Sequence, residues 1–455
     1  GQEGQEGQEG QEGQEGPDTF LMIWLSFVAA IVVFVAVFSA AHVLFRAPDG
    51  KETSRKLRMA WFDNAKFILL IFVTLDHLPP ATPTSGLQDV SAFPCTEFHT
   101  RALALISGWA TSRASRQGGT KTTGAPLARS EEDARWARLQ AVLFKLLAPL
   151  VLFLMTVGSF TKVLKTGHPP KSLFSYVHTI YYDLKNPYDP MNEVAHLWWL
   201  ESLIFWQLIA LLLWRCPISL RLLVSLAGFC LSRYLPPLPF MLNSALAFMP
   251  FYFLGQAFPA ERVLDKIPEV SPLTVAAGFS AMTLYSLFEP TFSYYWDLPE
   301  PHDHQPLNAD ELAFFSWPLM PTNKVTKISQ TWLGMSFTFN LVNLLFVLAF
   351  LLLLCPRSNS WYTELGQHTL YPYMLNWLPL VLGGYPLAFM LNSPSSPCLR
   401  WLLKLLYATA QTAIFSSSLT RATPLSWVIE PTWLEHLIRY PKSKASDEGA
   451  KPSEQ

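Results

Sequence analysis

Charged residues are scarce in this sequence. Asp, Glu, Lys and Arg make up 15% of the 455 residues, and the formal net charge is −1. Because nucleic-acid-binding proteins concentrate positive charge on one surface, this composition argues against a nucleic-acid partner. The sequence also lacks any Asn-x-Ser/Thr acceptor, so native N-glycosylation cannot report which segments face outward.

Cysteine is scarce as well. The five cysteines form no Cys-x-x-Cys pair and no Cys/His spacing typical of a metal site. The pattern indicates neither a zinc site nor a disulfide framework, and we expect no bound metal. The five are Cys95, Cys216, Cys230, Cys355 and Cys398.

Hydrophobic runs, by contrast, are abundant. Hydrophobic residues make up 50% of the chain, and many apolar runs approach the ~20 residues that cross a bilayer. We therefore predict an all-α integral membrane protein with about ten core transmembrane helices and one extra N-terminal transmembrane helix. The expected spans are 20–46, 58–77, 98–112, 139–160, 196–214, 218–235, 240–258, 271–290, 329–354, 364–390 and 398–419.

The segments outside these spans divide the chain. Residues 1–19 contain a low-complexity Gly-Gln-Glu repeat, which we predict to be disordered because it has no apolar side chains to bury. The extra helix at 20–46 is followed by a basic linker at 47–57. A large membrane domain then spans 58–431, and a polar tail follows at 432–455.

Lys and Arg indicate the orientation. Residues 46–58 carry five of them, residues 79–97 carry none, and residues 113–138 carry six. Since cytosolic links are rich in Lys and Arg, we predict that 47–57, 113–138 and the C-terminal tail are cytosolic. Four lysines in 161–195, a link predicted to be external, run against this pattern. The host is expected to be a plasma or secretory-pathway membrane.

The stretch 58–77, RMAWFDNAKFILLIFVTLDH, carries more ionisable groups than a lipid-facing helix tolerates. Asp63, Asn64 and Lys66 stand at one end, and Asp76 and His77 at the other. At ~100° per residue, Lys66 and His77 fall within about 20° on one helical face, roughly 16 Å apart along the axis. They therefore mark two depths of one pocket. Two alternatives stay open: snorkelling of both side chains to the interfaces, and a structural Asp63–Lys66 pair.

This stretch resembles the first core helix of the membrane-bound acyltransferase-3 family, in its fucose 4-O-acetylase-like branch. The family has a basic residue, ten intervening residues and a histidine, which correspond here to Lys66 and His77. The family's commoner form has arginine at the basic position. Lysine keeps the charge but lacks the planar fork that binds carboxylate or phosphate bidentately.

Further motifs extend the resemblance from about residue 58 to 431. Ser107-Gly108 resembles a small pair on the family's second helix, where small residues allow close helix approach or room for a ligand; plain packing is the alternative. HLWWLESLIFWQL at 196–208 resembles a His-x-Trp-x-Leu helix entry, with His196, Trp198 and Glu201 as pocket candidates. An interfacial aromatic belt is the competing interpretation for that segment.

A third motif, LGQHTLYPYMLN at 365–376, resembles a family signature that ends in histidine. Asn376 stands at that last position here, so it can form hydrogen bonds but cannot transfer a proton. Residues 416–431 resemble the family's closing segment.

The resemblance implies an O-acyltransferase that moves acetyl from cytosolic acetyl-CoA to a carbohydrate or glycan hydroxyl across the bilayer. No tightly bound cofactor is expected, since acetyl-CoA would be a substrate. His77 would act as general base or carry the acyl group, because an imidazole pKa near ~6.5 suits either task. Lys66 would steer the donor's negative charge, with Asp63, Asn64 and Asp76 in supporting positions.

Three alternatives remain. A transporter or flippase-like protein would use Lys66, His77 and Glu201 to line a substrate or proton path. A polytopic acyltransferase could use a longer acyl chain. A catalytically degenerate family member would explain Asn376 in place of histidine.

Overall fold

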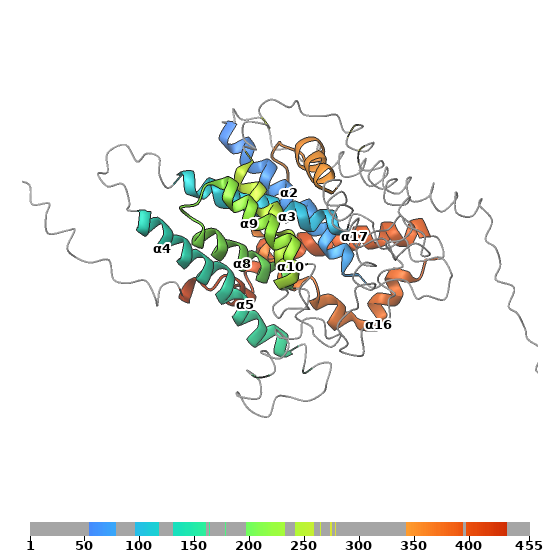
Figure 1. Ribbon diagram of the computed structural model, residues 1–455. Coiled ribbons are helices and arrows are strands. Elements are labelled where there is room, and N and C mark those ends of the chain that lie inside the picture. Colours follow the sequence, from blue (N-terminus) through green and yellow to red (C-terminus); the bar gives the residue numbers. More distant parts are fainter. Residues whose placement is uncertain are drawn as a thin grey trace, which may run out of the picture.

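The computed structural model describes residues 54–78, 96–117, 131–160, 197–232, 242–258, 343–394 and 397–434, with the isolated residues 163, 178, 264, 274 and 278. Within these ranges every regular element is a helix and none is a strand (Figure 1). The all-α part of the prediction is therefore confirmed for the described residues. The predicted spans at 20–46 and 271–290, and most of the one that begins at 329, lie outside them.

The first half contributes the longest helices. They are α2 (Ser54–Asp76), α3 (Thr96–Gln117), α4 (Glu131–Val142), η1 (Leu143–Leu147), α5 (Ala148–Phe153) and η2 (Leu154–Gly158). The last four form one continuous helical run with π-helical turns at η1 and η2. Pro149, the second residue after η1, has no N–H to donate, so the wider π turn lies where the regular bonding pattern is interrupted.

The described helices from residue 198 onward follow. They are α8 (Trp198–Leu212), α9 (Ile218–Ser232), α10 (Leu242–Ala257), η7 (Phe350–Leu354), η8 (Leu365–His368), α15 (Leu370–Leu375), α16 (Leu378–Asn392), α17 (Pro397–Ser416), α18 (Ser418–Arg421) and α19 (Leu425–Ile429). Residues 364–390, expected as one span, are broken into η8, α15 and α16. Pro372 and Pro379 fall in the first turns of α15 and α16, where proline favours a new helix start, whereas Pro386 lies inside α16.

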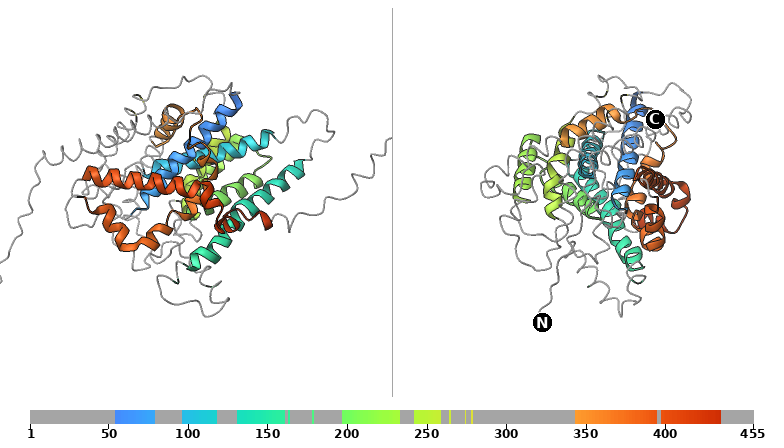
Figure 2. Two further views of the ribbon diagram at one scale, coloured as in Figure 1. Left: turned by 180° about the vertical axis from the view of Figure 1, so that it is seen from behind. Right: turned by 90° about the vertical axis from the view of Figure 1, so that its right-hand side faces the viewer.

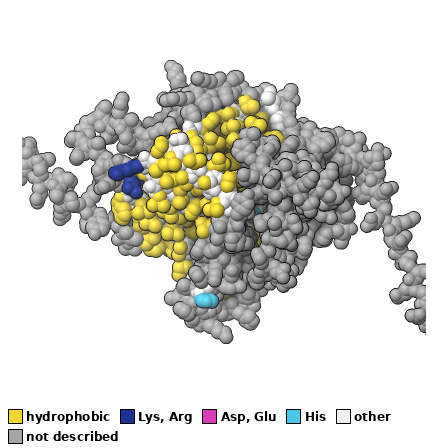
Figure 3. Space-filling view, in the orientation of Figure 1, with side chains coloured by type: hydrophobic (Ala, Val, Ile, Leu, Met, Phe, Trp, Pro, Cys, Tyr) yellow, Lys and Arg dark blue, Asp and Glu magenta, His cyan; other side chains and the backbone are white. Residues whose placement is uncertain are grey.

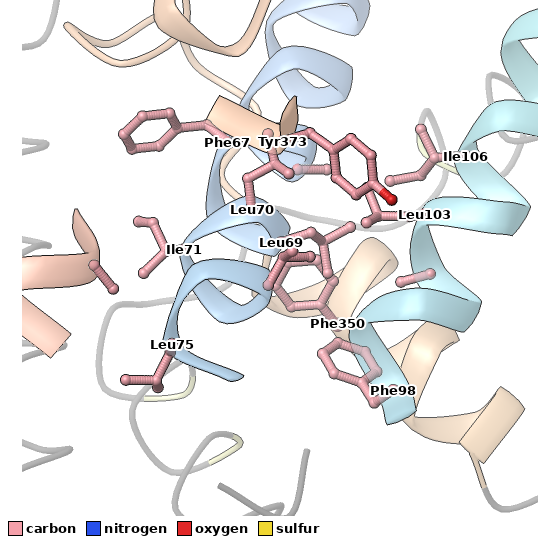
Figure 4. Packing of buried hydrophobic residues seen from close by; sticks show 14 of the residues in the cluster. Phe67, Leu69, Leu70, Ile71, Leu75, Phe98, Leu103, Ile106, Phe350 and Tyr373 are labelled. Atoms are coloured by element: carbon pink, nitrogen blue, oxygen red, sulfur yellow. The ribbon is translucent and has the colours of Figure 1, made fainter. Parts of the chain in front are cut away.

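The helices pack side by side in the order α9, α10, α3, α2 and α17 (Figure 2). The helix α2 is central to this arrangement, since α3, α15, α17 and η8 all contact it. Its apolar side chains form the core with those of neighbouring helices. Figure 4 shows Leu69 and Leu70 of α2 close to Leu103 of α3, with Phe98 against Phe350 nearby.

The contact between α3 and α10 depends on two glycines. A Cβ added to Gly108 would overlap the backbone carbonyl of Tyr252, and a Cβ added to Gly255 would overlap that of Leu105. The two backbones therefore touch directly, as small residues allow in closely packed helix pairs. Close packing, the alternative interpretation of the Ser107-Gly108 pair, is what the structure shows at Gly108.

One described helix, Arg135–Gly158, is long and apolar enough to cross a membrane, and Trp198–Leu212, Ile218–Ser232 and Asn343–Leu354 are shorter apolar helices. Leu143, Leu147, Val151 and Met155 are exposed at every fourth position, which places them on one outward stripe. Figure 3 shows hydrophobic side chains covering much of one face, with Lys and Arg gathered at one edge. The number of membrane spans remains a prediction.

Candidate functional site

The first part of the site is the middle of α2, where Lys66 is paired with Asp63. The Lys66 ammonium lies 2.8 Å from the Asp63 carboxylate, one turn earlier on the same helix. It also lies 4.6 Å from the centre of the Phe62 ring. The carboxylate is 95% buried, so the pair compensates a charge that would be costly alone. The structural pairing considered for these two residues is therefore present.

Asn64 connects α2 to a segment almost 300 residues later. Its amide nitrogen donates to the carbonyls of Pro356 and Ser358, both at 3.0 Å. Its amide oxygen accepts from the Thr363 hydroxyl at 2.7 Å. Since both amide hydrogens and the oxygen are engaged, Asn64 holds the 356–363 segment against α2.

Backbone contacts strengthen this junction. A Cβ on Gly366 would overlap the carbonyl of Asp63, so η8 sits directly on α2. The Trp61 indole donates to the carbonyl of Leu351 at 2.6 Å, and the Cys355 thiol donates to the carbonyl of Trp61 at 3.5 Å. Burial raises the pKa of the Cys355 thiol well above its usual range, so it stays neutral. The segments 61–66 and 365–376, two of the motifs from the sequence, are thus in contact.

His77 lies just beyond the C-terminal end of α2. The helix ends at Asp76, and His77 occupies the following turn, partly exposed, with its backbone N–H donating to the Thr74 carbonyl at 3.2 Å. The Thr74 hydroxyl is 3.2 Å from that of Thr412 on α17. Lys66 and His77 therefore mark two depths along α2, three turns apart. The side chain of Asp76 lies outside the described residues.

The second part of the site is the start of α8, where the 196–208 motif meets the 365–376 motif. The backbone N–H of Trp199 donates to the Tyr373 hydroxyl at 3.1 Å, and the two rings meet edge to face with centres 5.3 Å apart. Figure 4 shows the Tyr373 hydroxyl pointing toward Leu103 and Ile106 of α3. Trp198 packs on Phe248, with ring centres 5.5 Å apart. His196 lies outside the described residues.

Glu201 stands in the first turn of α8, where the helix dipole favours an anion. One of its carboxylate oxygens, Oε2, is buried and has no hydrogen-bond partner among the described residues. The carboxylate interacts electrostatically with Tyr373. It can therefore accept a hydrogen bond from a group that enters this region.

In Asn376 both side-chain polar atoms, the amide nitrogen and the amide oxygen, are buried without a hydrogen-bond partner among the described residues. The residue as a whole is 99% buried. Its backbone carbonyl accepts from the Gln411 amide at 2.7 Å. Buried unpaired amides are rare and costly in native proteins. A hydroxyl both donates and accepts, so it matches both open positions of Asn376.

Sequence reasoning did not select three residues that belong to these surroundings. Tyr373 matched the 365–376 motif but was given no role. Arg101 is 98% buried and packs on Phe248 of α10 with its guanidinium 5.1 Å from the ring centre, and Lys404 is 99% buried on α17. The sequence feature that could have identified Arg101 and Lys404 is that each is an ionisable residue inside a predicted span.

Among the described residues, no group of three or more His, Cys, Asp or Glu side chains could hold a metal ion. Searches against models of protein families, curated proteins and solved structures return no match. The functional interpretation therefore depends on the motifs and on how the structure arranges them.

Proposed function

We propose that this chain is a membrane O-acyltransferase that transfers acetyl from acetyl-CoA to a hydroxyl of a carbohydrate or glycan. The observation that carries the proposal is the meeting of three separate motifs. The 61–66 segment is fixed by Asn64 to residues 356–363, and the motif that follows them places Tyr373 on the start of α8. Motifs of one active site are expected to converge in this way.

His77 supplies the chemistry in this proposal. As general base it takes the proton of the acceptor hydroxyl, whose oxygen attacks the thioester carbonyl, and the CoA thiolate leaves and is protonated. In the relay alternative the imidazole nitrogen first receives the acetyl group and then passes it to the hydroxyl. Lys66, which lies nearer the cytosolic side of α2 than His77 in this proposal, steers the donor's negative charge.

The buried and unpaired side chains of Glu201 and Asn376 support a hydroxyl-rich acceptor. A carbohydrate offers several groups that both donate and accept hydrogen bonds, and a site with open polar atoms discriminates strongly in favour of such a ligand. We place the acceptor near the 365–376 motif.

Membrane placement belongs to the proposal as well, with about ten core spans and the extra N-terminal helix. The outward apolar stripe on the Arg135–Gly158 helix and the exposed leucines of α9 support it, because soluble proteins rarely expose such continuous apolar surface.

The test is ester-linked acetate on surface glycans of cells that express wild type, His77→Ala or His178→Ala in equal membrane amounts. His178 is an exposed histidine that belongs to none of the motifs and serves as the matched control. We expect a gain with wild type and the control, and a loss of about 100-fold or more in transfer with His77→Ala. Equal acetate in wild-type and empty cells would contradict the proposal.

A transporter or flippase-like protein is the second candidate. The buried Lys404, inside a predicted span, favours it, because ionisable residues at such positions often line substrate or proton paths. Substrate movement across sealed vesicles without acyl transfer would support this candidate. A degenerate family member would show neither activity.

A further inference from the structure

A cavity of about 380 Å³ has none of the candidate site's residues in its described lining. It is lined by residues of α3 and α4, by the ends of α8 and α10, and by the start of α9. Its volume falls at the lower end of the range for small-molecule sites. Its described lining residues are Ser112, Arg138, Trp214, Ile218, Arg221, Gln256 and Ala257.

Arg138 is held at the wall of this cavity by few contacts. Its guanidinium carbon lies 4.2 Å from the centre of the Trp214 ring, and one terminal nitrogen donates to the Thr111 carbonyl at 3.3 Å. A guanidinium has five N–H donors in a planar fork. Most donors of Arg138 therefore remain available to a ligand.

Arg221 is fixed more firmly on the opposite wall. It donates to the Cys216 carbonyl at 3.1 Å, to the Trp214 carbonyl at 2.5 Å and to the Gln256 side-chain oxygen at 3.2 Å. These bonds set the plane of the guanidinium before any ligand arrives. Two of its five N–H donors remain.

The cavity carries a net positive charge. Two guanidinium groups line it, and none of its described lining residues is Asp or Glu. The C-terminal ends of α8 and α10 each contribute the equivalent of about half a negative charge, which offsets only part of the charge of the two guanidinium groups. Arg135 already donates to the carbonyl of Leu211 at the end of α8, at 3.5 Å.

We propose that this cavity binds a phosphate group, supplied by the headgroup of an anionic phospholipid. Two planar guanidinium forks match phosphate oxygens. The lipid source follows from the surroundings: Ile218 lines the cavity and is exposed, and Leu220 and Leu223, two and five residues later on α9, expose apolar side chains as well. Basic pockets between membrane helices on the cytosolic side bind such headgroups. The lipid source rests on the membrane placement in the proposed function.

The experiment titrates the purified full chain in mild detergent and follows the midpoint of thermal unfolding. The probes are dioctanoyl phosphatidic acid, dioctanoyl phosphatidylcholine, inorganic phosphate and adenosine 3′,5′-bisphosphate. The variants are Arg138→Gln, Arg221→Gln and Ser112→Asp, which places a carboxylate in the cavity. Lys145→Gln is the control, because Lys145 is exposed on η1 and does not line the cavity.

We expect phosphatidic acid to raise the midpoint of wild type and Lys145→Gln equally, and phosphatidylcholine to have little effect. Apparent affinity should fall about tenfold or more in Arg138→Gln and in Ser112→Asp. These two variants keep the test valid if Arg221→Gln does not fold, since Arg221 holds more internal bonds.

Equal affinity for phosphatidic acid in wild type, Arg138→Gln and Ser112→Asp would overturn the site. Stronger stabilisation by inorganic phosphate or the bisphosphate than by phosphatidic acid would overturn the lipid source. The readout does not involve acetyl transfer, so a chain that binds the lipid but transfers no acetyl would contradict only the proposed function.

Discussion

At the scale of single residues, the chemistry of α2 is divided between holding the fold and serving a reaction. Asn64 uses its whole amide to hold residues 356–363, and Asp63 is paired with Lys66. His77, at the far end, is the histidine that the resemblance assigns to acyl transfer. We expect Asp63, Asn64 and Lys66 to affect mainly the stability of the protein, and His77 to affect mainly its activity.

Replacing Asn64 by alanine should destabilise the protein strongly. The change removes one hydrogen-bond partner from the Pro356 and Ser358 carbonyls and from the Thr363 hydroxyl, and a buried group whose hydrogen bond is lost costs about 1–3 kcal/mol. With partial relaxation we expect the free energy of unfolding to fall by about 2–4 kcal/mol, measured by denaturant unfolding in detergent. Gln367→Ala, on the exposed surface of η8, is the control and should change it by less than about 0.5 kcal/mol. A similar small change for Asn64→Ala would contradict the role of this amide.

Because Asp63 and Lys66 form an ion pair, we expect that the effects of replacing each on the free energy of unfolding do not add. Lys66→Met alone leaves a buried carboxylate unpaired and should lower the free energy of unfolding by about 2–3 kcal/mol, less than for a fully buried pair because Lys66 is partly exposed. Adding Asp63→Asn should recover most of this loss. A double-mutant cycle measures the coupling. Additive effects of the two changes would show that the ion pair contributes little.

At the scale of elements, close backbone contact sets how α3 and α10 pack. Gly108→Ala forces a methyl group into the Tyr252 carbonyl, so the helices must separate, and we expect a loss of about 3 kcal/mol or more. Gly158→Ala is the control, because its nearest neighbours would lie at 3.8 Å and 3.9 Å. That change should be neutral or slightly stabilising, since alanine favours a helix. Equal stability of the two variants would contradict the direct backbone contact.

Elements were predictable where apolar composition alone defines them. The runs at 139–160, 196–214 and 240–258 correspond to the Arg135–Gly158 helix, α8 and α10. The division of 364–390 was missed because its high hydrophobicity concealed the effect of Pro372 and Pro379, which stand in the first turns of α15 and α16. Hydrophobicity alone does not show where a helix starts or stops.

At the scale of the whole molecule, the contacts that join distant segments could not be predicted. Asn64 meets Thr363 and Trp199 meets Tyr373, and no periodicity in the sequence links either pair. The sequence likewise does not indicate that Arg138 and Arg221 line one cavity, because only tertiary packing brings these two residues together. The motifs indicated candidate site residues, and tertiary packing decided which of those residues are neighbours.

At the same scale, the proposed acyl transfer has two sides: we propose that Lys66, in the middle of α2, steers the donor from the cytosolic side and that His77, after the end of α2, meets the acceptor. The most direct test uses sealed vesicles with oriented protein, acetyl-labelled acetyl-CoA on the cytosolic side and a de-O-acetylated glycan on the far side. We predict labelled, ester-linked acetate on the glycan with wild type and His178→Ala, and about 100-fold less with His77→Ala. Equal transfer by wild type and His77→Ala, or no transfer by wild type, would contradict the account.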